Sequence, residues 1–89
     1  MPNKQRKWEI VGDYQWQYCV STGMIEYRIH HNSQKKTLTY QKIYNGYDGI
    51  HYAPEEIDSL TIPCANMPTV EQAINAVVKA MANELRSIL

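Results

Sequence analysis

The sequence predicts an α+β fold, in which a four- to five-stranded antiparallel β-meander carries one C-terminal amphipathic α-helix packed on one face. Apolar and polar residues alternate with a period of two over residues 14–20 and 25–31, which is typical of half-buried strands. Turn residues separate these runs. From Thr69 onward, apolar residues recur at helical spacing instead, which indicates a helix with one buried side.

A length of 89 residues fits one domain, and four segments are predicted within 1–89. They are a flexible basic tail (1–6), a β-meander (7–44), an irregular acidic segment with a short strand at most (45–68) and a helix (69–89).

The first hairpin is predicted from the two alternating runs and a turn at Thr22-Gly23. Glycine supplies the positive φ that tight hairpin turns need. The predicted register places apolar residues opposite one another on one face: Val20 with Ile25, Tyr18 with Tyr27, and Trp16 with Ile29. The opposite face then carries polar pairs, including Cys19 beside Glu26.

Two further strands extend this hairpin on either side. After a turn near residues 32–35, a strand from about 37 to 44 is expected, with Ile29 opposite Leu38. This register places Lys42 on the apolar face, which indicates a bulge or an edge position there. On the other side, Trp8 and Ile10 are expected to pair with Trp16 and Tyr14.

The segment 45–68 is predicted to be irregular because it contains Asn-Gly and Asp-Gly turn signals and three prolines. A short strand is expected only at Leu60 and Ile62. The helix that follows has a capping box, with Thr69 as N-cap and Gln72 bonding back, and is expected to run roughly 20 residues to the end. One helix about 10 Å wide cannot cover the whole aromatic face. We therefore expect 45–68 or a second copy of the chain to cover the remainder.

Charge is unevenly distributed although the formal net charge is zero. Residues 1–44 carry seven basic and three acidic side chains, whereas residues 45–68 carry four acidic side chains and no Lys or Arg. No apolar run is long enough to span a bilayer or to serve as a signal sequence. Two cysteines are too few for a disulfide framework, so a reduced, cytoplasmic protein is expected.

Catalytic and metal sites are not predicted. The neighbouring carboxylate of Glu26 would raise the thiol pKa of Cys19, which opposes nucleophilic chemistry. His30 and His31 are adjacent on a strand, so they point to opposite faces and cannot bind one ion together. The sequence contains no phosphate-binding glycine loop and no close Cys or His ligand spacing. We therefore expect no cofactor, no metal and no enzymatic activity.

The function that the sequence favours is a small non-enzymatic protein-binding module, such as an inhibitor or regulator that occludes a partner with a basic surface. Tyrosine is favoured at protein interfaces, and nearby carboxylates would steer a basic partner. The expected contact residues are Tyr44, Tyr47, Asp48, Tyr52, Glu55, Glu56 and Asp58. A sheet-covering role for these tyrosines, with merely solvated acids, is the alternative interpretation of the same residues.

Two other classes of function remain open. A nucleic-acid-binding accessory protein would use the basic N-terminal half, through Lys4, Arg6, Lys7, Arg28, Lys35 and Lys36. A small enzyme is the third class, and it would require an unusually reactive Cys19 thiol.

Overall fold

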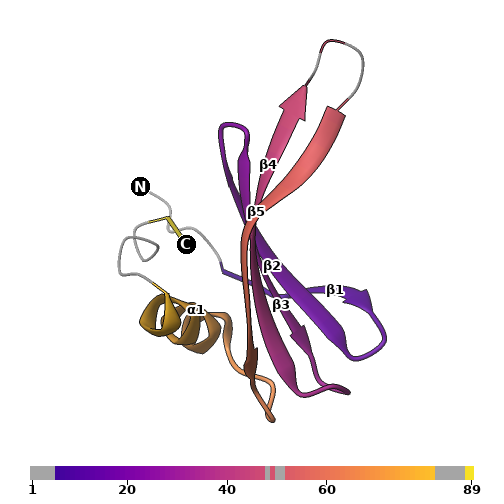
Figure 1. Cartoon of the computed structure of the whole chain (residues 1–89). Helices are drawn as coiled ribbons and strands as arrows, with labels where there is room; N and C mark the ends of the chain where they lie inside the picture. Colours follow the sequence, from indigo (N-terminus) through magenta and orange to yellow (C-terminus); the bar gives the residue numbers. More distant parts are fainter. Residues whose placement is uncertain (1–5, 48, 50–51, 82–87) are drawn as a thin grey trace.

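The computed structural model describes residues 6–47, 49, 52–81 and 88–89. These residues form a five-stranded antiparallel sheet in the order β1-β2-β3-β4-β5 and one C-terminal helix, so the predicted α+β meander is confirmed. Figure 1 shows the helix on one face of the sheet. The elements are β1 (Glu9–Gly12), β2 (Gln15–Thr22), β3 (Ile25–Asn32), β4 (Thr37–Tyr47), β5 (Tyr52–Pro63) and α1 (Val70–Ala80).

Each of the three predicted strand registers is wrong by two residues. Val20 pairs with Tyr27 rather than Ile25, because Gly23 (φ 61°) is the first residue of the turn and β2 continues through Thr22. Similarly, Ile29 pairs with Tyr40 rather than Leu38, and Ile10 with Trp16 rather than Tyr14. A shift of two residues preserves the alternation of side chains, so each residue keeps its predicted face.

The prediction that residues 45–68 are irregular is wrong for 45–47 and 52–59, which form the end of β4 and most of β5, whereas the short strand expected at Leu60 and Ile62 is confirmed as the last part of β5. Strand β5 has 12 residues and pairs along β4 from Thr37 to Tyr47. Its prolines are tolerated because β5 is an edge strand, where a missing N–H breaks no ladder bond if it points outward. The segment therefore extends the sheet sideways and does not fold over its aromatic face.

The bulge expected at Lys42 is present, although Lys42 does not lie on an edge strand. Lys42 pairs with Asp58 and Ile43 with Glu56, so β5 contains one extra residue at Ile57. Lys42 is the cross-strand partner of the buried Tyr27, so its side chain lies on the core face, and its Nζ lies 5.7 Å from the centroid of the Tyr27 ring.

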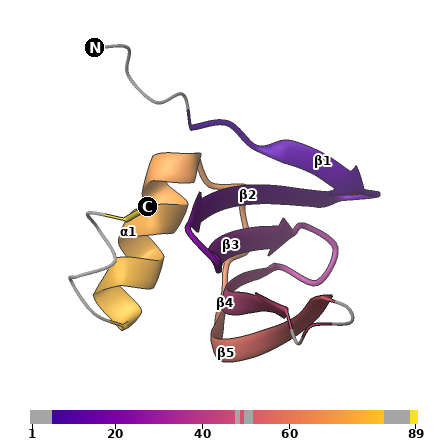
Figure 2. The ribbon, with the colours of Figure 1, turned by 90° about the horizontal axis from the view of Figure 1, so that it is seen from above.

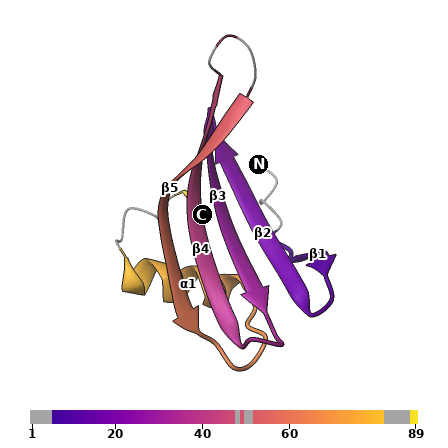
Figure 3. The same ribbon diagram turned by 45° about the vertical axis from the view of Figure 1, so that its right-hand side comes forward.

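The core lies between α1 and the face of the sheet that the alternation predicted to be buried. Ile29, Leu38 and Tyr40 are buried there, and the apolar side of α1 packs onto them. The core members are Tyr18, Val20, Tyr27, Ile29, Leu38, Tyr40, Val70, Ala73, Ile74, Val77, Val78 and Leu89. Figure 2 shows α1 on one side of the sheet, and in Figures 1 and 3 α1 crosses the lower part of this face and leaves the far ends of β4 and β5 uncovered.

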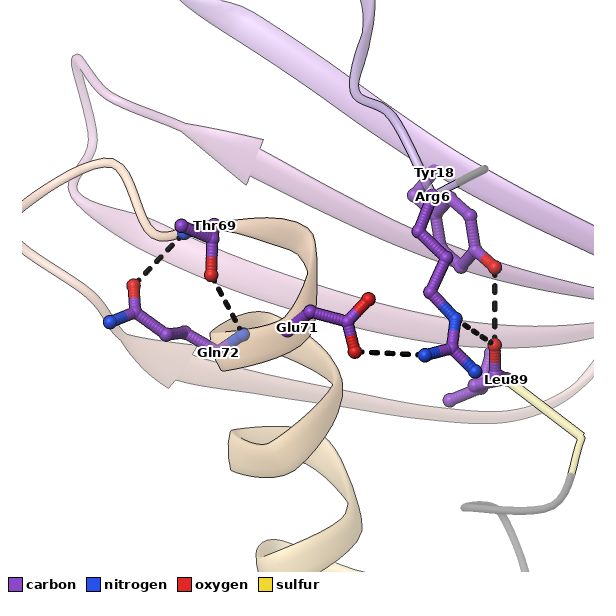
Figure 4. A network of polar contacts seen from close by, with 6 residues as sticks. All are labelled: Arg6, Tyr18, Thr69, Glu71, Gln72 and Leu89. Carbon is purple, nitrogen blue, oxygen red and sulfur yellow. Dashed lines mark hydrogen bonds and ion pairs between the residues drawn. The ribbon is translucent and has the colours of Figure 1, made fainter. Parts of the chain in front are cut away.

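The start of the helix is confirmed, but its predicted length is wrong. Thr69 is the N-cap and forms the capping box with Gln72. The helix ends at Ala80, with Met81 as C-cap, instead of running to the end of the chain. Figure 4 shows why Leu89 cannot extend it: Leu89 lies beside the first turn of α1, where Arg6 bonds both Glu71 and the Leu89 carbonyl.

The N-terminal prediction needs one correction as well. The sequence predicts Arg6 in a flexible tail, but its Nε donates to the Leu89 carbonyl at 3.1 Å and its Nη1 contacts a Glu71 carboxylate oxygen at 2.8 Å. Tyr18 Oη also donates to the Leu89 carbonyl, at 3.1 Å. These contacts hold the two ends of the described chain on the sheet. Within the described residues, no helix is long and apolar enough to cross a membrane.

Candidate functional site

The residues predicted to bind a partner lie mainly on a two-stranded projection, which we call the β4–β5 arm (Ile43–Tyr47 and Tyr52–Ile57). Strands β4 and β5 are the longest in the sheet, and in Figure 1 their far ends extend beyond α1. The β2–β3 turn reaches toward the same end. The arm is therefore a sheet extension that carries side chains on two open faces.

Tyr44 is the aromatic residue that the structure places most clearly on the arm. It pairs with Glu55 on β5 and with Ile25 on β3, and 39% of it remains exposed. Its hydroxyl lies 3.9 Å from the Met24 sulfur, in the β2–β3 turn. Its ring covers Gly46 so closely that a Cβ there would lie 2.6 Å from Tyr44 Cε2. Tyr44 is therefore positioned by contacts with both Met24 and Gly46.

The acidic side chains do not form one cluster, because the pleat and the bulge distribute them over two faces. Glu55 is exposed and shares the face of its cross-strand partner Tyr44. Glu56 lies on the opposite face, where its Oε1 accepts from Gln41 Nε2 at 2.9 Å. Asp58 lies below the arm, and its Oδ1 accepts from the Ser59 backbone N–H at 2.9 Å. Glu55 is thus the acid best placed beside the exposed aromatic ring.

Some of the predicted residues fall outside what the structure describes. Asp48 and Lys4 lie outside the described residues, as do the side chains of Tyr47 and Tyr52. The backbones of Tyr47 and Tyr52 are paired at the end of the β4–β5 ladder. Their contribution to binding therefore stays a prediction.

The basic residues of the alternative function are not brought together. Arg6 is bound to Glu71, and Arg28 contacts Glu26 at 2.6 Å on the outer face of the sheet. Lys35 and Lys36 are exposed in the β3–β4 turn, at the opposite end of β4 from the arm. Lys7 is also exposed, next to Arg6 at the start of the described chain. Among the described residues, these side chains form no continuous basic surface.

The outer face of the sheet is polar, and its side chains largely bond one another. His30 Nε2 and Gln15 Oε1 are 3.2 Å apart, and Thr39 and Thr61 are joined through their hydroxyls at 3.2 Å. Cys19 lies on this face. Its cross-strand partner is Arg28, whereas the predicted register places Glu26 there. Burial raises the pKa of the Cys19 thiol, and Glu26 raises it further against the lowering effect of Arg28. The direction of this shift disfavours a reactive thiolate.

Histidines do not assemble a metal site in the described part of the chain. His31 is fully buried, with Nε2 3.0 Å from the Cys64 carbonyl oxygen and Nδ1 3.2 Å from the Ser33 hydroxyl. His30 faces the other side of the sheet, as predicted from adjacency. Across residues 6–47, 49, 52–81 and 88–89, no three His, Cys, Asp or Glu side chains are grouped as metal ligands, and no pocket is found.

Sequence reasoning missed two residues that shape the arm. Gly46 resembles a turn residue after Asn45, but it lies within β4 and makes room for an aromatic ring. Met24 lies in the observed β2–β3 turn, one residue beyond the turn that the sequence predicts at Thr22-Gly23. The available signal for Gly46 was its position two residues after Tyr44, since side chains two apart share one face of a strand.

Comparisons of the chain with family models, with curated proteins and with solved structures found no match.

Proposed function

We propose that this chain is a small protein-binding module whose β4–β5 arm docks on a basic surface of a partner and occludes it. The observation that supports this most is that the arm extends beyond α1 and carries an exposed tyrosine ring beside a carboxylate. Tyr44 and Glu55 face the same side of the arm, beyond the cover of α1, and residues 45–68 contain no Lys or Arg.

The chemistry of this surface suits protein recognition. A half-exposed tyrosine buries apolar ring area while its hydroxyl keeps a hydrogen bond, and it loses few rotamers. A carboxylate next to the ring accelerates encounter with a cationic surface and disfavours acidic partners. Because Tyr44 already rests on Gly46 and Met24, little conformational freedom is lost when it binds.

The mode of action that follows is inhibition or regulation by surface occlusion. The rigid base of the sheet would hold the arm at a fixed angle against the partner, without a chemical step. We place this activity in the cytoplasm, in keeping with Cys19 and Cys64, which are both free thiols.

Charge reversal on the arm tests this function. Bound partners would be captured from cells with the tagged protein and counted by mass spectrometry, together with any nucleic acid. We expect Tyr44→Ala combined with Glu55→Lys to remove the specific protein partners. The replaced ring removes the anchor, and the new charge repels a basic surface.

The matched control changes net charge equally at a distant place. Gln34→Lys with Asn66→Lys adds two positive charges at exposed positions off the arm. We expect this control to retain the same partners. If the arm variant keeps every partner, or if both variants lose them equally, the arm is not the binding surface. Nucleic acid in place of protein in the wild-type capture would also contradict the proposal.

A further inference from the structure

The two edges of the sheet are protected very differently. Exposed strand edges offer unpaired N–H and C=O groups to other strands, so proteins commonly block them with proline, bulges or charge. Strand β5 has all three devices: Pro54 and Pro63, a bulge at Ile57, and several acidic side chains.

The direction of the β5 backbone shows that these prolines lie where a second chain would need a donor. Cys64 N–H donates to the Lys36 carbonyl at 2.9 Å, so residue 64 bonds toward β4 and Pro63 faces outward by alternation. Asn45 N–H donates to Met24 on the β3 side, so its partner Pro54 faces away from β4 as well. The outward N–H of Ser59, between them, is already bound by Asp58.

Strand β1 is less protected, because its blocking devices are a register shift at Val11, the single carboxylate of Glu9 and its short length. Its four residues, Glu9–Gly12, contain no proline, and all four are exposed. Ile10 is 77% exposed and Val11 is 48% exposed. Tyr14, in the adjoining turn, is 60% exposed and has a positive φ of 59°, which is rare for an aromatic residue. In Figures 2 and 3, no described element covers the outer edge of β1.

The backbone of Ile10 is directed toward this open edge. Ser33 N–H donates to the Tyr14 carbonyl at 2.8 Å, so residue 14 bonds toward β3. Alternation then directs Gln15 and Gln17 toward β1, where they pair with Gly12 and Glu9. Ile10, which lies between these two bonded partners, therefore presents its N–H and C=O outward.

We infer that β1 pairs antiparallel with β1 of a second copy of the chain, about a two-fold axis at Ile10, to form one continuous ten-stranded sheet. The two Ile10 residues exchange backbone hydrogen bonds and bring their exposed side chains together on the helix-bearing face. An isologous contact of this kind closes as a dimer and leaves the β4–β5 arms at the two ends.

The charges around Ile10 favour a second copy in this orientation. Lys7 precedes Ile10 by three residues and Asp13 follows it by three, and both are exposed. Antiparallel pairing centred on Ile10 brings Lys7 of each copy toward Asp13 of the other, just beyond the two ends of β1, whereas parallel pairing would bring like charges together. The sequence around β1 is therefore complementary to itself.

The interface is small, which sets the expected affinity. An edge of four residues lies in the size class of weak, transient interfaces, for which a dissociation constant on the order of 10–100 μM is reasonable. The mass measured by sedimentation equilibrium should therefore rise from 10.3 kDa toward about twice that value as concentration passes through this range.

The test compares edge variants at matched concentrations. We expect Ile10→Lys to remain monomeric, because two like charges would face each other across the strand pair, and Ile57→Lys on the β5 edge to dimerise like the wild type. Lys7→Glu should weaken the dimer at least tenfold, and the double variant Lys7→Glu with Asp13→Lys should restore it. Circular dichroism would confirm that each variant is folded.

Two results would overturn the inference. One is a wild-type mass that stays at that of the monomer up to about ten times the expected dissociation constant. The other is a dimer that survives Ile10→Lys or that Ile57→Lys abolishes, because its interface would then lie elsewhere. Glu55→Lys on the arm should leave the dimer intact, so failure of this inference is distinguishable from failure of the proposed function.

Discussion

Tyr40 shows how a core without phenylalanine accommodates its aromatic residues. The sequence contains seven tyrosines and no phenylalanine, and Tyr18, Tyr27 and Tyr40 are all buried on the predicted face. Tyr40 is only 1% exposed. Burial raises its pKa to about 12, with smaller contributions from Tyr27 and Asp58. A buried phenol is thus kept neutral at pH values where an exposed tyrosine ionises.

This pKa predicts a loss of stability in alkali. The folded-state pKa of Tyr40 lies above the value of about 10 in the unfolded chain, so the folded protein holds this proton more tightly. The resulting stability is complete below pH 10 and is lost as pH rises from about 10 to about 12. Urea unfolding across this range should show a smaller decline for Tyr40→Phe than for the wild type. An equal decline in both proteins would exclude Tyr40, and Tyr14→Phe on the surface serves as control.

Residue-scale prediction succeeded for the faces of the sheet and failed for the registers. Tyr18, Tyr27 and Ile29 lie on the buried face, as their alternation required. Their cross-strand partners are displaced by two residues, since a two-residue shift leaves every face unchanged. Only the position of the turn distinguishes the two registers. The predicted register has Gly23 as the second residue of the turn, whereas Gly23 is the first residue of the observed turn.

At the scale of elements, periodicity predicted β2 and β3, but it predicted only the part of β5 around Leu60 and Ile62. The bulge at Ile57 inserts a residue, so Glu55 and Asp58 lie on one face although their spacing is odd. No single period of two therefore runs through β5. Three acidic residues and two prolines further reduce its strand propensity, and an edge position tolerates both.

The end of α1 was also beyond prediction, because the apolar spacing continues past Ala80 while the helix does not. Leu89 is 1% exposed, and its carbonyl accepts hydrogen bonds from Arg6 and Tyr18, both distant in sequence. Local periodicity carries no information about such contacts. The capping box at Thr69 was predictable because it depends only on residues three apart.

The burial of Leu89 predicts that it is a major source of stability. We expect Leu89→Ala to lower the free energy of unfolding by about 2–4 kcal/mol, because it removes buried apolar volume from the core. Chemical denaturation measures this change. Ile57→Ala, at a position 51% exposed, should cost less than about 0.5 kcal/mol. Similar small losses for both variants would show that the Leu89 side chain does not stabilise the core.

At the scale of the whole molecule, charge segregation was visible in the sequence, but its arrangement in space was not. Glu55, Glu56 and Asp58 do lie on the edge strand β5, yet Glu55 and Glu56 point to opposite faces. The basic residues of the N-terminal half are separated by ion pairs with Glu26 and Glu71. Both outcomes depend on strand pairing and on contacts between segments far apart in the chain.

These arrangements favour the β4–β5 arm as the binding surface over the scattered basic residues. The arm has an exposed aromatic ring beside a carboxylate, it extends beyond α1, and contacts with Met24 and Gly46 hold the ring in place. If dimers form through β1, two arms would act together and raise the apparent affinity for a repetitive or dimeric partner.

Site-specific photo-cross-linking tests the binding role of the arm most directly. A photoreactive amino acid would replace Tyr44 on the arm and, in a separate protein, Gln34 in the distant β3–β4 turn, and both proteins would be illuminated in cells. We expect position 44 to yield a cross-link to a discrete protein through a basic surface segment, and position 34 to yield none to that protein. Equal cross-linking at both positions, or a cross-link to nucleic acid alone at position 44, would contradict the proposed function.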